Sequence, residues 1–292
     1  MNDSLDPLLN CRSIAESLGA LENMLRNAGV DDFERDARVL ACAAFNIAQI
    51  DLILRPDAAA SPEALARLAD FARRRLNREP VTRIVGSRGF WTFEMEVQPE
   101  VLDPRPDTEV LVEMCVARLE ARRAESLTFL DIGTGSGALL AALLSEFPKA
   151  RGHAIDVSPH AVAAARQNLS ILGLSERAVV LQQSWADPVP QRFDLVVSNP
   201  PYIPSAEIVT LDPEVRDFDP VLALDGGADG LDAYRAIAKR WRDWIIPGGL
   251  LALEIGATQA ADICRLFYST GARLLEARKD YAGNDRTLLW AE

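Results

Sequence analysis

The 292-residue sequence is poor in the side chains that serve most enzymes as nucleophiles, bases or metal ligands. It has only two histidines, His153 and His160, and four cysteines that lie far apart with no CxxC pair. Structural zinc sites and disulfide frameworks need denser clusters of these residues. We therefore expect no metal site, reduced thiols in a cytoplasmic protein, and a chemistry that uses neither histidine nor cysteine.

The sequence also lacks the features of membrane proteins and of general nucleic-acid binders. No apolar run approaches the ~18 residues needed to span a bilayer, and the start, MNDSLDPLLN, lacks the basic flank and apolar core of a signal peptide. The net charge of −12 disfavours nucleic acid as a partner, because such binding gains affinity by neutralising phosphates. We expect no membrane association and no direct nucleic-acid contact, whereas a basic protein partner is compatible with this charge.

Residues 1–78 are predicted to form a small all-helical domain, because their apolar residues recur at helical spacing behind clear start signals. Ser13 and Glu16 have the spacing of a capping box. Ser61 followed by Pro62 is typical of an N-cap with proline in the first helical turn. This short, capped, amphipathic pattern predicts a helical unit distinct from the rest of the chain.

Residues 79–105 are predicted to be a linker that contains a β-hairpin. The segment FEMEVQPEVL alternates apolar and polar residues, which is the period of a strand. It follows a stretch that contains Gly86 and Gly89, where we expect the hairpin turn.

Residues 106–292 are predicted to form an α/β domain. From residue 127 onward, apolar segments typical of strands (TFLDIG, GHAIDV, AVVLQQ, FDLVVS and LLALEIG) alternate with helical segments. Such alternation indicates a doubly wound, mainly parallel, Rossmann-like sheet covered on both faces. Two last strands, near 273–279 and 286–291, lie so close in sequence that we expect one antiparallel edge pairing between them.

A glycine-rich turn in FLDIGTGSGALL separates the first of these strands from a helix. Its glycines, Gly133 and Gly135 among them, let the backbone approach a ligand, and the helix start offers unpaired N–H groups. Asp156 ends the next strand, where a carboxylate can accept both hydroxyls of a ribose. The loop also satisfies the dinucleotide pattern, so a nicotinamide-dependent dehydrogenase and a plain tight turn are alternatives at this point. Trp185, after the third strand, could stack on an adenine or simply pack at the sheet edge.

The segment VVSNPPYIP, residues 196–204, ends the fourth strand in an unusual way. Two consecutive prolines fix two φ angles and remove two backbone donors, so Asn199 and Tyr202 are held stiffly at the carboxyl end of the strand. The side-chain carbonyl of Asn199 and the backbone carbonyl of Pro200 can accept both hydrogens of a planar –NH₂ group. Such a hold favours the positive charge that develops when the nitrogen attacks an electrophilic methyl group.

The chain resembles the release factor glutamine methyltransferases, the PrmC/HemK family within the S-adenosylmethionine-dependent class I methyltransferases. The resemblance runs nearly end to end and is carried by REPVTRIVG, VLDPRPDTEVLVE, DIGTGSGALL, AIDVSPHAVAAARQN, VVSNPPYIP, PVLALDGGADGL, PGGLLALEIG and KDYAGNDRTLLW. NPPY alone is shared with methyltransferases that act on amino groups of adenine. Its combination with DPRPDTE and the helical domain is more specific.

The resemblance implies a class I methyltransferase fold and methyl transfer from S-adenosylmethionine to the side-chain amide nitrogen of a glutamine. That glutamine lies in the Gly-Gly-Gln motif of peptide chain release factors, and the helical domain would grip the release factor. The implied donor-binding residues are Asp131, Ile132, Gly133, Thr134, Gly135, Asp156, Trp185 and Asn199. The implied substrate-binding residues are Asn199, Pro200, Pro201 and Tyr202, of which Asn199, Pro200 and Tyr202 are the catalytic set.

Two positions depart from the family pattern. Ser184 stands where an acidic residue commonly precedes the tryptophan position, which leaves open how an adenine amino group would be held. Asp107 stands where glutamate is common. The nearest alternative function is an adenine-amino (N6) methyltransferase of DNA or RNA, which would normally carry a basic target-recognition region that this sequence lacks.

Overall fold

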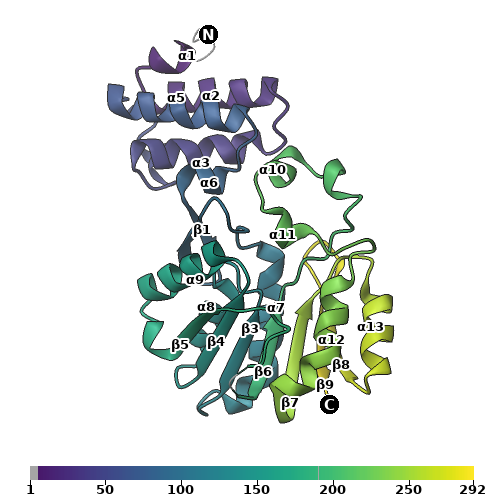
Figure 1. Ribbon diagram of the computed structural model, residues 1–292. Coiled ribbons are helices and arrows are strands. Elements are labelled where there is room, and N and C mark those ends of the chain that lie inside the picture. The colour runs from purple at the N-terminus through teal and green to yellow at the C-terminus, as the bar shows by residue number, and fades with distance from the viewer. Residues whose placement is uncertain (1–5, 190) are drawn as a thin grey trace. The chain divides into compact units, whose positions relative to one another are not determined.

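The computed structural model describes residues 6–189 and 191–292 and divides into two compact units, Met1–Gly86 and Ser87–Glu292 (Figure 1). The division falls inside the segment 79–105 that the sequence analysis sets apart as a linker. Each unit has its own apolar core. None of the helices described is long and apolar enough to cross a bilayer.

The first unit is helical over its described length. Its elements are α1 (Asp6–Leu9), α2 (Ile14–Asn27), α3 (Phe33–Phe45), α4 (Asp51–Leu54), α5 (Pro62–Leu76) and α6 (Val81–Val85). Both predicted helix starts are confirmed. The Ser13 hydroxyl accepts from the Glu16 N–H, and the Ser61 hydroxyl accepts from the Ala64 N–H, each at 3.2 Å. The Glu16 carboxylate accepts the Arg12 N–H at 2.7 Å. The N–H groups of Ile14 and Ala15, which lack an intrahelical partner, donate to the backbone oxygens of Ala58 and Pro56.

The predicted hairpin is present as β1 (Ser87–Phe90) and β2 (Phe93–Glu96), but its turn differs from the expectation. Gly86 ends α6 and Gly89 lies within β1, whereas the chain reverses between the strands at Trp91. Trp91 has a φ of +56°, which is unfavourable for a bulky residue. Glu109 compensates by accepting the Trp91 N–H at 3.0 Å, and Glu146 accepts its indole N–H at 2.9 Å. These contacts could not be foreseen from the local sequence.

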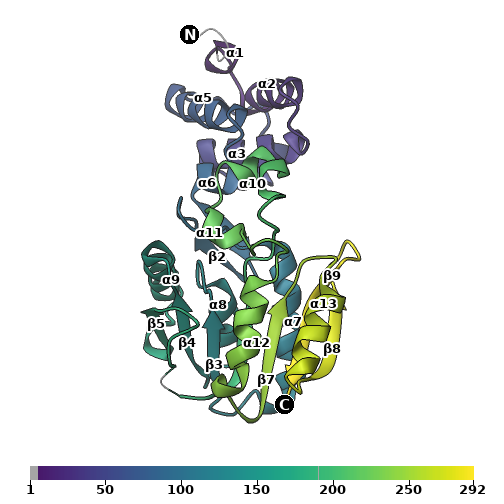
Figure 2. The same cartoon turned by 45° about the vertical axis from the view of Figure 1, so that its right-hand side comes forward.

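The second unit contains a seven-stranded sheet in the order β5-β4-β3-β6-β7-β9-β8 (Figure 1), seen from a second side in Figure 2. The strands are β3 (Thr128–Ile132), β4 (Arg151–Asp156), β5 (Ala178–Gln182), β6 (Phe193–Ser198), β7 (Ile245–Glu254), β8 (Arg273–Lys279) and β9 (Asp285–Ala291). All pairings among the strands from β3 to β7 are parallel. The expected antiparallel pairing of the last two strands, β8 and β9, is confirmed at the edge of the sheet. A second antiparallel pairing was not expected, because β9 inserts between β7 and β8 and so runs against β7 as well.

Helices cover both faces of this sheet, as the doubly wound prediction requires. One apolar cluster joins the sheet to α7 (Glu109–Leu119), α8 (Ala138–Glu146) and α9 (Pro159–Ile171). The other joins it to α12 (Asp232–Trp244) and α13 (Ala260–Ser269). Short elements complete the unit: η1 (Pro106–Thr108), η2 (Glu120–Arg122), η3 (Ser175–Arg177), η4 (Ile208–Thr210), α10 (Pro213–Arg216) and α11 (Val221–Leu224). The helix α7 is not predicted by the sequence pattern, because its buried residues lie nearly all round it and blur the helical period.

Candidate active site

The candidate site lies at the switch point of the sheet. β3 pairs with β4 on one side and with β6 on the other, so the connections that leave these strands diverge and open a crevice at their carboxyl ends. A cavity of about 520 Å³ opens there. The predicted site residues that line it are Ile132, Gly133, Thr134, Gly135, Asp156, Trp185, Asn199 and Pro201. Asp131, Pro200 and Tyr202, which the structure also describes, are outside this lining.

The glycine-rich loop after β3 presents bare backbone to the cavity on one side and packs closely on the other. A Cβ added to Gly133, whose φ is +69°, would meet nothing within 4 Å. A Cβ added to Gly137, whose φ is +85°, would approach Ala165 of α9 to 3.2 Å. The loop is therefore pressed against a helix and leaves room for a ligand along its open side.

Asp156 ends β4 with its carboxylate anchored by backbone groups. One oxygen accepts the Gly135 N–H at 3.0 Å, and the other accepts the Ser158 N–H at 2.9 Å. Each carboxylate oxygen can accept a second hydrogen bond. Because Asp156 also lines the cavity, this carboxylate is oriented to receive two further donors, as the paired hydroxyls of a ribose would supply.

Asp131 supports the same loop from behind. Its side chain is 0% exposed, and one carboxylate oxygen accepts the Thr134 hydroxyl at 2.6 Å. Its other oxygen, Oδ1, has no hydrogen-bond partner among the described residues. Burial raises the pKa of Asp131 to about 7. A buried acceptor without a donor is the kind of group that a bound ligand or a water completes.

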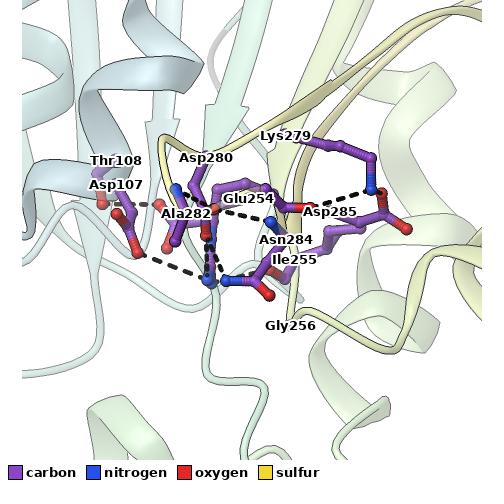
Figure 3. A network of polar contacts seen from close by, with 12 residues as sticks. Asp107, Thr108, Glu254, Ile255, Gly256, Lys279, Asp280, Ala282, Asn284 and Asp285 are labelled. Atoms are coloured by element: carbon purple, nitrogen blue, oxygen red, sulfur yellow. Dashed lines mark hydrogen bonds and ion pairs between the residues drawn. The ribbon is translucent and has the colours of Figure 1, made fainter.

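Asn199 follows β6, and its amide has a fixed partner on one side only. The amide Nδ2 donates to the Thr108 hydroxyl at 3.2 Å. That hydroxyl donates to the Glu254 carboxylate at 2.7 Å (Figure 3). Among the described residues, no donor reaches Asn199 Oδ1 or the backbone oxygen of Pro200. These two carbonyl oxygens are thus without a donor among the described residues, and Asn199 itself lies at the cavity wall.

Tyr202 does not line the cavity and instead contacts residues from the carboxy-terminal part of the chain. Its hydroxyl lies 3.5 Å from Arg286 Nη1, and its backbone oxygen accepts from Gln259 Nε2 at 2.9 Å. Burial, with a contribution from the charge of Glu254, raises the pKa of Tyr202. The hydroxyl is therefore neutral, and it lies outside the cavity lining.

Several residues of the site were not predicted from the sequence. Thr108 lines the cavity, and Glu254, 1% exposed, lies directly behind it. The connection between β6 and α12 folds back so that Ile203 pairs with Asp225, which brings Asp225 and Leu222 to the cavity. Two signals could have found them: a glutamate at the end of an apolar strand, and a connection much longer than usual.

Ser184 and Asp107, the two departures from the family pattern, also have defined places. Ser184 lines the cavity beside Trp185, and its hydroxyl accepts the Ala186 N–H at 3.1 Å. Asp107 lies 3.5 Å from the guanidinium of Arg286. Over the part of the chain that the structure describes, no cluster of three or more His, Cys, Asp or Glu side chains is arranged to bind a metal ion.

The fold and the site together define a class I methyltransferase: a doubly wound sheet with an antiparallel seventh strand, a glycine loop after its first strand and Asn-Pro-Pro-Tyr after its fourth. The catalytic domain of hMettl16, solved in complex with an RNA hairpin, has the same fold, with a TM-score of 0.54 at 14% identity over 77% of this chain and 81% of that one. Two protein-family models match the chain, the PrmC N-terminal domain over residues 16–86 and the methyltransferase small domain over residues 106–211.

The chain belongs to the release factor glutamine methyltransferase family. It is 47% identical to the release factor glutamine methyltransferase of Rhodospirillum rubrum over 265 residues, which are 91% of this chain and 81% of that protein. It is 42% identical to the enzyme of the same name from Caulobacter vibrioides over 278 residues, 95% of this chain and 96% of that protein. Membership in this family implies a methyl donor of the S-adenosylmethionine type.

Proposed function

We propose that this chain transfers a methyl group from S-adenosylmethionine to the side-chain amide nitrogen of the glutamine in the Gly-Gly-Gln motif of peptide chain release factors. The observation that carries the proposal is the pair of available carbonyl oxygens on Asn199 and Pro200, next to a cavity bounded by the glycine loop. A primary amide has two N–H donors on one nitrogen, and two neighbouring acceptors are its complement.

The residues around the cavity fit the donor. Asp156 would accept the ribose hydroxyls, the backbone from Gly133 to Gly135 would pass along the methionine part, and Trp185 would lie beside the adenine. Asp131, buried outside the cavity lining, would support this loop by accepting the Thr134 hydroxyl. When bound, S-adenosylmethionine supplies an electrophilic methyl group on a sulfonium.

Asn199 and Pro200 would act on the substrate nitrogen. An amide nitrogen is a poor nucleophile because its lone pair is delocalised into the carbonyl group. Two fixed acceptors orient that nitrogen, and their hydrogen bonds strengthen as positive charge develops on it. The proton leaves after methyl transfer, so no strong base is needed, in keeping with a chain that has only two histidines.

An adenine-amino methyltransferase is the second candidate, because an adenine –NH₂ would meet the same two acceptors. The net charge of −12 and relatives named for release factors favour the protein substrate. The helical unit would then grip the release factor, and the enzyme would work in the cytoplasm beside the translation machinery, without direct contact to nucleic acid or membrane.

The test compares methyl acceptors directly. The full chain is incubated with isotopically labelled S-adenosylmethionine and, separately, with a folded release factor, the same release factor carrying Gln→Asn in its Gly-Gly-Gln loop, DNA and RNA. Mass spectrometry of the product should find one methyl group on the loop glutamine and none on the variant. Label on adenine, or on several protein sites, would overturn the proposal.

A further inference from the structure

The hydrogen bonds that run from Asn199 through Thr108 to Glu254 have a single direction. A threonine hydroxyl has one proton, and here it goes to Glu254 Oε2 at 2.7 Å. The same hydroxyl can then only accept from Asn199, which offers Nδ2 at 3.2 Å. In its ionised form the buried Glu254 carboxylate only accepts hydrogen bonds, and it thus determines that the Asn199 amide turns its Nδ2 toward the threonine.

This direction matters because an asparagine side chain is almost symmetric in shape. The two prolines after Asn199 fix its backbone, but they do not determine the rotation of its amide group. If the amide turned over, Asn199 would present its N–H₂ to the reacting nitrogen, and two donors would face each other. Only the hydrogen-bond partners of the amide make one of its two orientations more favourable than the other.

We propose that Thr108 and Glu254 are positioning residues for methyl transfer, which hold Asn199 so that its carbonyl oxygen faces the reacting amide nitrogen. The inference rests on the proposed function and adds two residues, from η1 and from the end of β7, to the machinery of that reaction. Neither residue needs to touch the substrate nitrogen for this role. Both act through Asn199.

The surroundings of Glu254 are consistent with a carboxylate kept as an acceptor. Burial raises its pKa to about 7, while the hydrogen bond from Thr108 and the charge of Arg286 act in the opposite direction. Arg286 donates to the backbone oxygen of Ile255 at 3.3 Å and pairs with Asp280 at 2.9 Å, so its charge is fixed close by (Figure 3). Asp107 faces the same group and opposes Arg286. The ionised form of Glu254 therefore gains population as the pH rises above neutral.

The first experiment measures single-turnover methyl transfer to a release factor at pH 8 by Thr108→Val, Thr108→Ser and wild type. Loss of the hydroxyl should lower the rate on the order of 10–100-fold, the range seen when an outer supporting partner is removed. Thr108→Ser should retain most of the rate, and calorimetric affinity for S-adenosylmethionine should be unchanged in both. Thr128→Val is the matched control, because Thr128 also donates to a carboxylate, Asp194, at 3.0 Å, but at the opposite end of β3. It should behave as wild type.

A double-mutant cycle separates positioning from mere structural support. If Thr108 acts through Asn199, adding Thr108→Val to Asn199→Ala should change the rate by less than about twofold, because the group to be oriented is already gone. Equal losses in both backgrounds would overturn the inference. Glu254→Gln keeps the shape but lets an N–H₂ face Thr108, so it should lower the rate in the wild-type background and not in Asn199→Ala. This variant decides the matter if Thr108→Val does not fold.

The outcomes for the two proposals are distinct. A wild-type enzyme that transfers no methyl group to the release factor contradicts the proposed function. A wild-type enzyme that does, together with Thr108→Val and Glu254→Gln variants of wild-type rate, contradicts only the positioning role.

Discussion

Arg286 of β9 lies 3.5 Å from the hydroxyl of Tyr202, and its guanidinium donates twice to the Asp280 carboxylate, at 2.9 and 3.2 Å. The Asp280 side chain is 1% exposed in this pair. The ion pair fixes Arg286 within the hairpin of β8 and β9, and the contact of Arg286 with the Tyr202 hydroxyl joins this hairpin to the Asn-Pro-Pro-Tyr segment. This contact links a part of the chain without cavity-lining residues to the segment that presents the two carbonyl oxygens.

The Arg286–Asp280 pair is expected to matter for stability far more than the exposed pair on the same hairpin. Arg286→Gln leaves a buried carboxylate without its partner, which is strongly destabilising. Lys279→Gln removes the exposed pair with Asp285, which is 2.7 Å long and contributes little. Urea unfolding of both variants should give a clearly lower midpoint for Arg286→Gln than for Lys279→Gln. Equal midpoints would show that the buried pair has no special role.

Asn199→Ala should impair the chemical step and spare donor binding. It removes one of the two acceptors for the reacting amide, while the Asp156 carboxylate keeps its anchors on Gly135 and Ser158. The loss of a comparable preorganised group lowers the rate on the order of 10²–10³-fold. Single-turnover methyl transfer measures the rate, and calorimetry measures affinity for S-adenosylmethionine. A defect confined to donor binding would contradict the role assigned to Asn199.

Deleting residues 1–86 should leave a unit that folds and binds the donor. Every cavity-lining residue lies between Glu100 and Ala236, inside the second unit. If the helical unit grips the release factor, the truncated enzyme should show a KM for that substrate raised by at least about tenfold, or about 1.4 kcal/mol of lost binding free energy. Steady-state kinetics with varied release factor measures this change, and calorimetry with S-adenosylmethionine is the control. An unchanged KM would refute the gripping role.

Asp131→Asn should change how stability depends on pH. Burial raises the pKa of Asp131 from 3.8 to about 7, so the folded state holds the proton more tightly than the unfolded state does. Stability from this group is complete below pH 3.8 and is lost as the pH rises through about 7. Between pH 5 and pH 8, wild type should therefore lose about 3 kcal/mol relative to Asp131→Asn.

Urea unfolding of the donor-free proteins at the two pH values measures this difference. Asp194→Asn is the comparison, because Asp194 is also buried but is paired with Arg122 at 2.7 Å. A constant gap between wild type and Asp131→Asn across this range would show that the Asp131 carboxyl does not change its protonation there.

Features that depend only on residues adjacent in sequence could be predicted from the sequence alone. Capping serines at positions 13 and 61 set helix starts, and alternating apolar segments set the strands of a doubly wound sheet. The glycines after β3 predict a tight turn there, and the prolines after β6 predict a rigid extended segment. Since parallel strands carry their following loops to one edge, the glycine loop, Asp156, Trp185 and Asn199 could be expected around one cavity.

Contacts between residues far apart in the chain arise only when the sheet is assembled, and no local sequence pattern predicts them. Thr108 is 91 residues from Asn199 and 146 from Glu254, and the three meet because the sheet order places β7 beside β6 and η1 against both. The same holds for β9, which pairs with β7 on one side and with β8 on the other. Hydrophobic period and turn chemistry describe a segment's own conformation. Partners are selected by packing and hydrogen bonding across the whole sheet, which no local pattern specifies.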